Sequence, residues 1–273
     1  MIRVISDGRL GNQLFHYAFA IAGAKALHTS FHIDFVHGKD EVAEWFEIEQ
    51  AVAPLRAGRL QKWLLGQRDR WLGPTIVEDD MQQVYRGFQN GTTYKGFFQS
   101  EQYFEQVADL IKNVFRLQAR WQQAFQQVAP AYDFDNSIVM HVRLGDYCTW
   151  GSPALGGTDM SLPASYYEHA LQHLGASAGS PVILISDDEP AALARLSFLR
   201  QVLVFRHNAV LSFQAMLHAR RLVVSNSSFA WWAAWLNPHQ PQVVAPQHWL
   251  GFKVGYEHPH GIMPASFAAV PVF

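Results

Sequence analysis

The sequence is short of charge and of cysteine, and it has no long hydrophobic run. Only 16% of its 273 residues are charged and the net charge at pH 7 is -2, which argues against nucleic-acid binding through a broad cationic surface. Cys148 is the only cysteine, which excludes an intrachain disulfide and a cysteine-based zinc site. The most apolar late run, 229–236, is far shorter than the ~20 residues of a membrane span, and the amino terminus lacks a secretory signal. We therefore expect a soluble, cytoplasmic protein.

Hydrophobic residues are abundant by contrast. They make up 49% of the chain, and 14% of the residues are Phe, Trp or Tyr. This composition supports a large core and excludes disordered and collagen-like classes. Aromatic rings also offer flat surfaces on which sugars and bases stack, so the composition hints at such a ligand.

A regular alternation of apolar strands and helices begins near residue 135. It predicts a parallel sheet with helices on both faces. Ligands of such sheets bind beyond the carboxyl ends of the strands. We place a domain boundary there and expect domains at 1–135 and 136–273. The predicted strands are 2–6, 31–36, 137–143, 181–186, 202–205, 222–225 and 242–245, and the predicted helices are 12–27, 100–128, 163–174, 189–199, 211–219 and 228–236.

The first polar strand end is His141-Val-Arg143-Leu-Gly-Asp146. A guanidinium at this place donates two parallel hydrogen bonds to phosphate oxygens and keeps its charge. Asp146 would orient Arg143. The alternative is a purely structural Arg–Asp pair at a turn.

Two further strand ends carry small polar or acidic residues. Asp187 and Asp188 precede a helix, so at least one of them should cap it, while the other could accept hydrogen bonds from a guanine edge. The run 225–228, Ser-Asn-Ser-Ser, opens the last predicted helix. One serine is expected to cap that helix, and four small polar residues in a row favour an anion site at its start.

The amino-terminal loop 7–13, Asp-Gly-Arg-Leu-Gly-Asn-Gln, joins a strand to a helix. It matches neither a Walker A loop nor G-x-G-x-x-G. It could cradle a phosphate or be a tight strand–helix turn. Two weaker signals are the pair Asp133 and Asp135, which we interpret as a turn, and the basic, aromatic stretch 56–71. That stretch predicts either a solvated helix or peripheral contact with an anionic membrane.

Taken together, these motifs resemble bacterial α-1,2-fucosyltransferases of glycosyltransferase family 11. The resemblance implies transfer of L-fucose from GDP-β-L-fucose to the 2-hydroxyl of a galactose, with inversion. It also implies an α/β, GT-B-like fold of two Rossmann-like halves with a cleft between them, and no metal or other cofactor. The motifs occur in family order at 7–18, 94–104, 141–147, 186–188 and 226–237.

The resemblance also assigns roles to residues. The family pattern H-x-R-R-x-D matches at His141, Arg143 and Asp146, but its second arginine is Leu144 here. Arg143, Asn12 and Asp146 are implied at the reacting centre. The implied donor-binding residues are Gly11, His141, Asp187, Asp188, Asn226, Ser227, Ser228 and Phe229, of which Ser227 and Ser228 would contact the phosphates.

The acceptor is less defined. It would be a galactose-containing glycan, possibly a lipid-linked O-antigen precursor, contacted from the amino-terminal half. The stretch 94–104 and the Gly-rich stretch 149–161, long enough for a mobile loop, are candidates. Two alternatives stay open: a fucosyltransferase of another linkage, and a non-catalytic GDP-sugar or glycan-binding protein, which the loss of charge at Leu144 favours.

Overall fold

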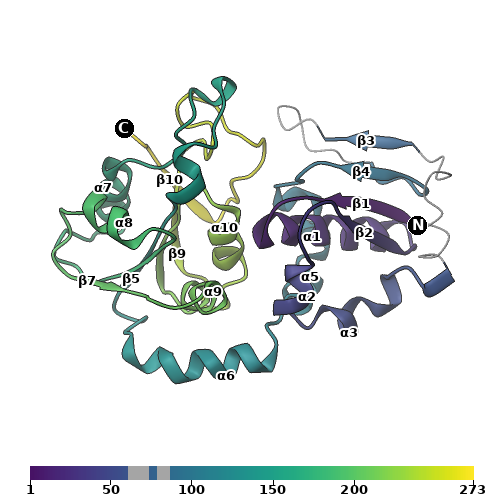
Figure 1. The fold of residues 1–273 in the computed structure, drawn as a ribbon, viewed down its shortest axis with the longest axis horizontal. Helices are drawn as coiled ribbons and strands as arrows, with labels where there is room; N and C mark the ends of the chain where they lie inside the picture. The colour runs from purple at the N-terminus through teal and green to yellow at the C-terminus, as the bar shows by residue number, and fades with distance from the viewer. Residues whose placement is uncertain (61–73, 79–86) are drawn as a thin grey trace. The chain divides into compact units, whose positions relative to one another are not determined.

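The computed structural model describes residues 1–60, 74–78 and 87–273. In that part of the chain, two compact units form, Met1–Gln118 and Ala119–Phe273 (Figure 1). Each unit is an α/β structure with its own parallel sheet.

The amino-terminal unit contains a sheet whose described strands, all parallel, follow the order β2-β1-β4-β3. The chain leaves β1 toward β2 and returns on its other side at β4, so the carboxyl ends of β1 and β4 form a topological switch point. The strands are β1 (Ile2–Ser6), β2 (Phe31–Phe35), β3 (Thr75–Val77) and β4 (Thr93–Lys95).

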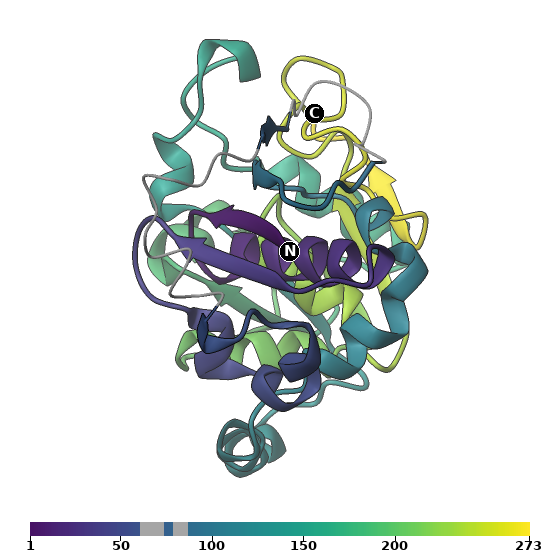
Figure 2. The ribbon, with the colours of Figure 1, turned by 90° about the vertical axis from the view of Figure 1, so that its right-hand side faces the viewer.

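Helix α1 (Leu10–Ala26) packs on β1 and β2 and is the core of this unit. It runs along the strands in both views (Figures 1 and 2). Nearly all of its side chains are buried, which confirms the buried helix predicted from its apolar residues. The other helices are α2 (Glu41–Trp45), α3 (Ile48–Val52), α5 (Ala108–Val114) and the short η1 (Ala53–Leu55), η3 (Glu101–Tyr103) and η4 (Glu105–Val107).

The carboxy-terminal unit has a larger parallel sheet with the order β10-β9-β8-β5-β6-β7. Its first strand, β5, lies between β6 and β8, so this switch point is between β5 and β8. The strands are β5 (Ile138–Val142), β6 (Val182–Ser186), β7 (Val202–Val204), β8 (Arg221–Val223), β9 (Gln242–Pro246) and β10 (Phe267–Val270).

Helices cover both faces of this sheet, as predicted: α7 and α8 lie on one side, and α9 and α10 on the other (Figure 1). The tryptophans Trp231 and Trp232 of α10 are fully buried, which confirms that they pack in the core. The helices are α6 (Ala119–Val128), α7 (Ala164–His173), α8 (Glu189–Arg195), α9 (Ala209–Leu217) and α10 (Ser228–Trp235), with short η5 (Ala129–Ala131), η6 (Gly145–Cys148) and η7 (Pro153–Leu155).

The two units divide before α6, earlier than the expected residue 135. Helix α6 packs on α9, where Gln214 donates to the carbonyl of Trp121 at 2.9 Å. The helix expected over 100–128 is divided into η3, η4, α5 and α6, with a break at 115–118 between α5 and α6. Within the described segments, no helix combines the length and the apolar character of a membrane-spanning segment.

Candidate functional site

The switch point of the carboxy-terminal unit brings the predicted polar strand ends together. Strand β5 and the loop after it each contact the loop after β8: the ring of His141, in β5, lies 2.8 Å from the Ser225 hydroxyl, and the Tyr147 hydroxyl donates to the carbonyl of Asn226 at 3.1 Å. Because β5 and β8 are parallel neighbours, their carboxyl ends meet at one edge of the sheet.

Arg143 occupies the centre of this edge. Its Nη2 donates to Asp146 Oδ1 at 2.6 Å, and its Nη1 lies 3.2 Å from Asp187 Oδ2. The guanidinium also lies over the Tyr147 ring, 5.4 Å from the ring centre. Its Nε is buried and has no hydrogen-bond partner among the described residues. The predicted Arg–Asp pair is thus present, and it leaves one N–H of Arg143 unused.

The two carboxylates that hold Arg143 differ in exposure. The Asp187 side chain is 26% exposed and also accepts a hydrogen bond from the Leu144 backbone N–H at 2.8 Å. Gly145 permits this approach, since a Cβ there would meet Asp187 Oδ2 at 2.5 Å. The Asp146 side chain is 46% exposed. Asp187 therefore fixes the loop, and Asp146 is the partner that a competing anion can displace.

Asp188 has a separate task. It is the N-cap of α8 and accepts from the Ala191 N–H at 3.1 Å, which confirms that one of the two acids caps this helix. Leu144, where the family pattern has a second arginine, is only 2% exposed and packs in the core. The charge lost at this position is therefore replaced by apolar packing.

His141 is buried beneath Arg143 and is neutral. Burial and the nearby positive charge of Arg143 lower the pKa of His141 to about 3. Its Nδ1 bonds Ser225, and its ring lies 6.0 Å from that of Phe229. His141 therefore anchors the β5 and β8 loops to each other.

Asn226, like Arg143, has a buried polar atom that is not used. Its Nδ2 donates to the carbonyl of Met160 at 2.9 Å, while its Oδ1 is buried without a hydrogen-bond partner in the described part of the chain. Ser227 stands at the N-cap of α10, as expected for one of the serines, but its hydroxyl makes no capping hydrogen bond. Ser228 is the first residue of that helix.

The amino-terminal unit has its own switch point, built from amides and a histidine. Asn12 Oδ1 accepts from Gln99 Nε2 at 2.8 Å, which joins the first turn of α1 to the loop after β4. Gly8, at φ +87°, leaves room for Asn12, because a Cβ there would overlap the Asn12 amide. Gly11 lies buried in the first turn of α1.

His16 of α1 links the end of β1 to the loop after β4. Its Nε2 lies 2.8 Å from the Gly96 carbonyl oxygen and its Nδ1 lies 2.9 Å from the Ser6 hydroxyl. A carbonyl only accepts, so Nε2 carries the proton and Ser6 donates to Nδ1. Burial lowers the pKa of His16 to about 4. The ring is therefore neutral at physiological pH.

A carboxylate faces the amino-terminal end of α1. The backbone N–H of Leu10 donates to Glu41 Oε2 at 2.9 Å, and Gln13 accepts from the Glu41 N–H and donates to the Lys39 carbonyl. This negative charge takes the place that a phosphate would occupy at a helix start. The geometry thus favours the tight-turn interpretation of loop 7–13 over a phosphate cradle.

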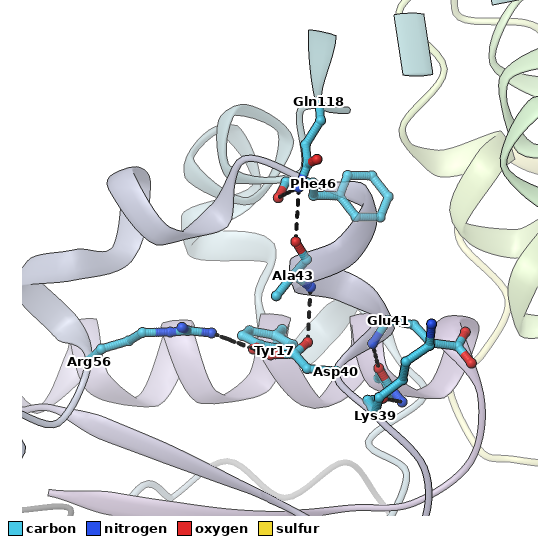
Figure 3. A network of polar contacts seen from close by, with 9 residues as sticks. Tyr17, Lys39, Asp40, Glu41, Ala43, Phe46, Arg56 and Gln118 are labelled. Atoms are coloured by element: carbon cyan, nitrogen blue, oxygen red, sulfur yellow. Dashed lines mark hydrogen bonds and ion pairs between the residues drawn. The ribbon is translucent and has the colours of Figure 1, made fainter. Parts of the chain in front are cut away.

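Asp40 secures the segment that carries Glu41. It caps α2 through the Ala43 N–H at 3.0 Å and accepts from the buried Tyr17 hydroxyl at 2.6 Å, which Arg56 also contacts (Figure 3). Arg56 opens the stretch 56–71, for which we expect either a solvated helix or contact with an anionic membrane, and here it contacts Asp40 and Tyr17 of its own unit. Residues 61–71 of that stretch lie outside the described residues.

Sequence reasoning missed His16, Glu41, Gln99 and Tyr147 as individual site residues. A histidine within an otherwise apolar helix was a usable signal for His16. The expected turn at Asp133 is confirmed, since it accepts from Asn136. Among the described residues, no three His, Cys, Asp or Glu side chains are grouped as a metal site.

The family model of Glycosyl transferase family 11 matches residues 75–253 of this chain. The O-antigen biosynthesis glycosyltransferase WbnK of Escherichia coli is 29% identical over 122 residues, which cover 42% of this chain and 39% of WbnK. An alpha-1,2-colitosyltransferase of Escherichia coli is 21% identical over 89% of this chain and 90% of its own length.

Solved structures of similar fold include FUT1 from Arabidopsis thaliana in complex with GDP, with a TM-score of 0.55, 12% identity, and coverage of 89% of this chain and 69% of that one. NodZ alpha-1,6-fucosyltransferase co-crystallized with GDP gives 0.53 at 15% identity, covering 85% and 91%. These likenesses confirm the predicted GT-B-like fold with two Rossmann-like halves. The predicted cleft between the halves stays a prediction.

Proposed function

Since the chain belongs to glycosyl transferase family 11, we propose that it transfers L-fucose from GDP-β-L-fucose to the 2-hydroxyl of a galactose in a glycan. The reaction inverts the anomeric carbon and uses no metal or other cofactor. The single observation that carries this proposal is Arg143, held at the switch point with one buried N–H unpaired.

The chemistry requires positive charge where GDP departs. The bond from the anomeric carbon to the β-phosphate oxygen breaks as the acceptor oxygen attacks from the opposite face, through an oxocarbenium-like state. Arg143 offers Nε and, when Asp146 turns into solvent, Nη2 as a planar fork for phosphate oxygens. The start of α10, with Ser227 and Ser228, adds partial positive charge.

The other predicted donor-binding residues differ in how well they are placed to contact GDP. Asp187 uses both oxygens on Arg143 and Leu144. Asp188 is exposed and caps α8 through Oδ1, so it is better placed to accept from guanine. Asn226 Oδ1 is a buried acceptor that suits a hydroxyl or N–H of the nucleoside.

No general base is assigned. With a pKa of about 3, His141 is a poor proton acceptor at neutral pH. Asp146 is engaged by Arg143, and the amide of Asn12 cannot take a proton. We propose that Asn12 orients a reacting group and that the leaving phosphate receives the hydroxyl proton.

A second candidate donor is GDP-colitose, which the similarity to the colitosyltransferase over 89% of this chain favours. The similarity to an O-antigen biosynthesis enzyme favours a lipid-linked glycan as acceptor. Contact of residues 56–71 with the inner membrane, which would bring the enzyme to such an acceptor, is part of the same proposal.

The test is GDP release from each donor with a β-galactoside acceptor, in the presence of EDTA, followed by linkage analysis of the product. We expect GDP-fucose turnover and an α-1,2 product. Faster turnover of GDP-colitose would reassign the sugar, and another linkage would correct the acceptor hydroxyl. GDP binding without turnover on any acceptor would support the non-catalytic alternative, and loss of turnover in EDTA would contradict metal independence.

A further inference from the structure

Trp150 is a large aromatic side chain left in solvent beside the candidate site. It is 51% exposed, whereas Trp231 and Trp232 of α10 are packed in the core. Its ring stacks on Tyr147, with ring centres 5.7 Å apart and planes inclined by 16°. Tyr147 in turn lies under the guanidinium of Arg143. The exposed indole is therefore connected to the proposed phosphate site through one intervening ring.

The loop that carries Trp150 is held at its base by residues of the site itself. The Met160 N–H donates to the Tyr147 carbonyl at 2.7 Å, and Asn226 donates to the Met160 carbonyl at 2.9 Å. The Tyr147 hydroxyl closes the circuit on the Asn226 carbonyl. Any movement of the loop base would disturb the groups around Arg143.

The rest of the loop also makes specific backbone contacts. Ser152 and Gly157 form an antiparallel bridge, and the Gly151 N–H donates to the Thr158 carbonyl at 2.7 Å. A Cβ at Gly151 would overlap the Gly157 carbonyl oxygen. These backbone contacts give the loop a defined conformation, and the mobility expected from the glycines of 149–161 stays a prediction. The indole itself is positioned by its stacking on Tyr147, which lowers the entropy lost when a ligand stacks on it.

We propose that Trp150 is a stacking platform for a neutral sugar ring of the acceptor glycan. A pyranose presents an apolar C–H face to an aromatic ring, and large aromatic side chains are common anchors in ligand sites. Guanine would instead need a carboxylate at its edge, and the one proposed for it, Asp188, lies after β6 as the N-cap of α8 and not in the loop that carries Trp150. The inference rests on the proposed function, because it names the second substrate of the same site.

The test compares Trp150→Ala, Trp150→Phe and Leu203→Ala. Leu203 is the matched control, since it is 48% exposed in the same unit but lies on strand β7. We expect Trp150→Ala to raise the KM for a β-galactoside about tenfold, as loss of one aromatic contact does, and to leave the Kd for GDP within twofold. Trp150→Phe should recover most of the loss, and Leu203→Ala should match the wild type.

Binding is measured separately by saturation-transfer NMR with lactose in the presence of GDP. The proposal is supported if saturation is transferred to galactose C–H protons in the wild type and this transfer is lost in Trp150→Ala. This result does not require fucose transfer, so the stacking proposal and the proposed function can fail independently. The stacking proposal would be overturned by equal saturation transfer in both proteins or by no transfer in either. Weaker GDP binding by Trp150→Ala would also overturn it, because it would assign Trp150 to guanine.

Discussion

The two units share a parallel sheet with a switch point beside its first strand, but differ in the order of the outer strands and in the charge placed at the switch point. Both have a parallel sheet with a switch point, at β1/β4 in one and β5/β8 in the other, and both lock the adjoining loops with a buried neutral histidine. In the amino-terminal unit the carboxylate of Glu41 faces the helix start. In the carboxy-terminal unit an arginine lies at the strand end with an unpaired N–H. Topology thus marks two possible sites, and side-chain chemistry assigns the anion to one of them.

Arg143 should therefore show the largest effect. Arg143→Ala removes the fixed charge that faces the departing phosphate, and loss of such a group slows turnover about 10²- to 10³-fold, roughly 3–4 kcal/mol of barrier. Arg143→Lys keeps the charge without the planar fork, so its turnover rate should lie between those of the wild type and Arg143→Ala. Steady-state rates and GDP affinity by calorimetry check this.

Arg206 is the matched control. It pairs with Glu189 and is 69% exposed in the same unit, so Arg206→Ala should leave rate and GDP affinity unchanged. Circular dichroism verifies that each variant is folded. Turnover of folded Arg143→Ala within threefold of the wild type would remove the anion assignment on which the contrast between the two units depends.

The buried histidines predict the next largest effect, a loss of stability in weak acid. Both His16 and His141 have pKa values depressed from 6.5, to about 4 and about 3. The unfolded chain therefore binds protons below pH 6.5 while the native chain does not, so the free energy of unfolding falls as pH decreases from 6.5 toward 4. Each histidine contributes up to about 1.4 kcal/mol per pH unit.

Urea unfolding at pH 7, 6 and 5 measures this slope. His16→Gln keeps a donor for the Gly96 carbonyl, and His141→Asn keeps an acceptor for Ser225, so each variant should flatten the pH dependence of its own unit. Asp34, whose pKa is lowered to about 2, loses its contribution only below about pH 3.8 and stays outside this window. Unchanged slopes in both variants would show that these rings do not stay neutral in the native protein.

Asn12 should affect rate and not donor affinity. If the amino-terminal switch point orients a reacting group and does not hold phosphate, Asn12→Ala lowers kcat about tenfold and leaves the Kd for GDP within twofold. Gln99→Ala should have a similar effect, and the double variant should be no worse than either, because the two amides act as one pair. A GDP affinity weakened as much as in Arg143→Ala would erase the difference between the units.

Much of this architecture was predictable because the signals are local. Strands β5, β6 and β9 are continuous apolar runs between turn residues, and Asp188 directly before Glu189-Pro190 indicates a helix cap. The short strands β3, β4 and β10 were missed. Three or four residues carry no periodicity. Strands β7 and β8 are equally short, but they stand in the regular strand–helix alternation that revealed them, which β3, β4 and β10 do not.

The site divides in the same way. Arg143, Asp146 and the 225–228 run were found because polar residues end apolar strands. The contacts that give them their chemistry are non-local. Asp187, after β6, accepts from the Leu144 N–H, after the neighbouring strand β5. Glu41 accepts from the first turn of a helix that begins 31 residues earlier in sequence. A single sequence shows which groups are present at an edge, but not which of them are already paired.

Replacing Glu41 should give the smallest effect, and it tests directly whether this carboxylate keeps anions away from the start of α1. Glu41→Ala removes the carboxylate from the start of α1, whose N-cap Arg9 makes no side-chain capping bond. We expect about 1 kcal/mol loss of stability, the usual value of a helix cap. Glu41→Gln, which keeps an acceptor oxygen, should lose less. The control is Glu44→Ala, where loss of the surface pair between Glu44 and Lys39 should cost under about 0.5 kcal/mol.

Glu41→Ala also tests anion binding. In the Arg143→Ala background, inorganic phosphate should raise the melting temperature of the Glu41→Ala, Arg143→Ala double variant and not that of the Arg143→Ala single variant. An equal response in both would mean that a carboxylate at α1 does not set the two units apart.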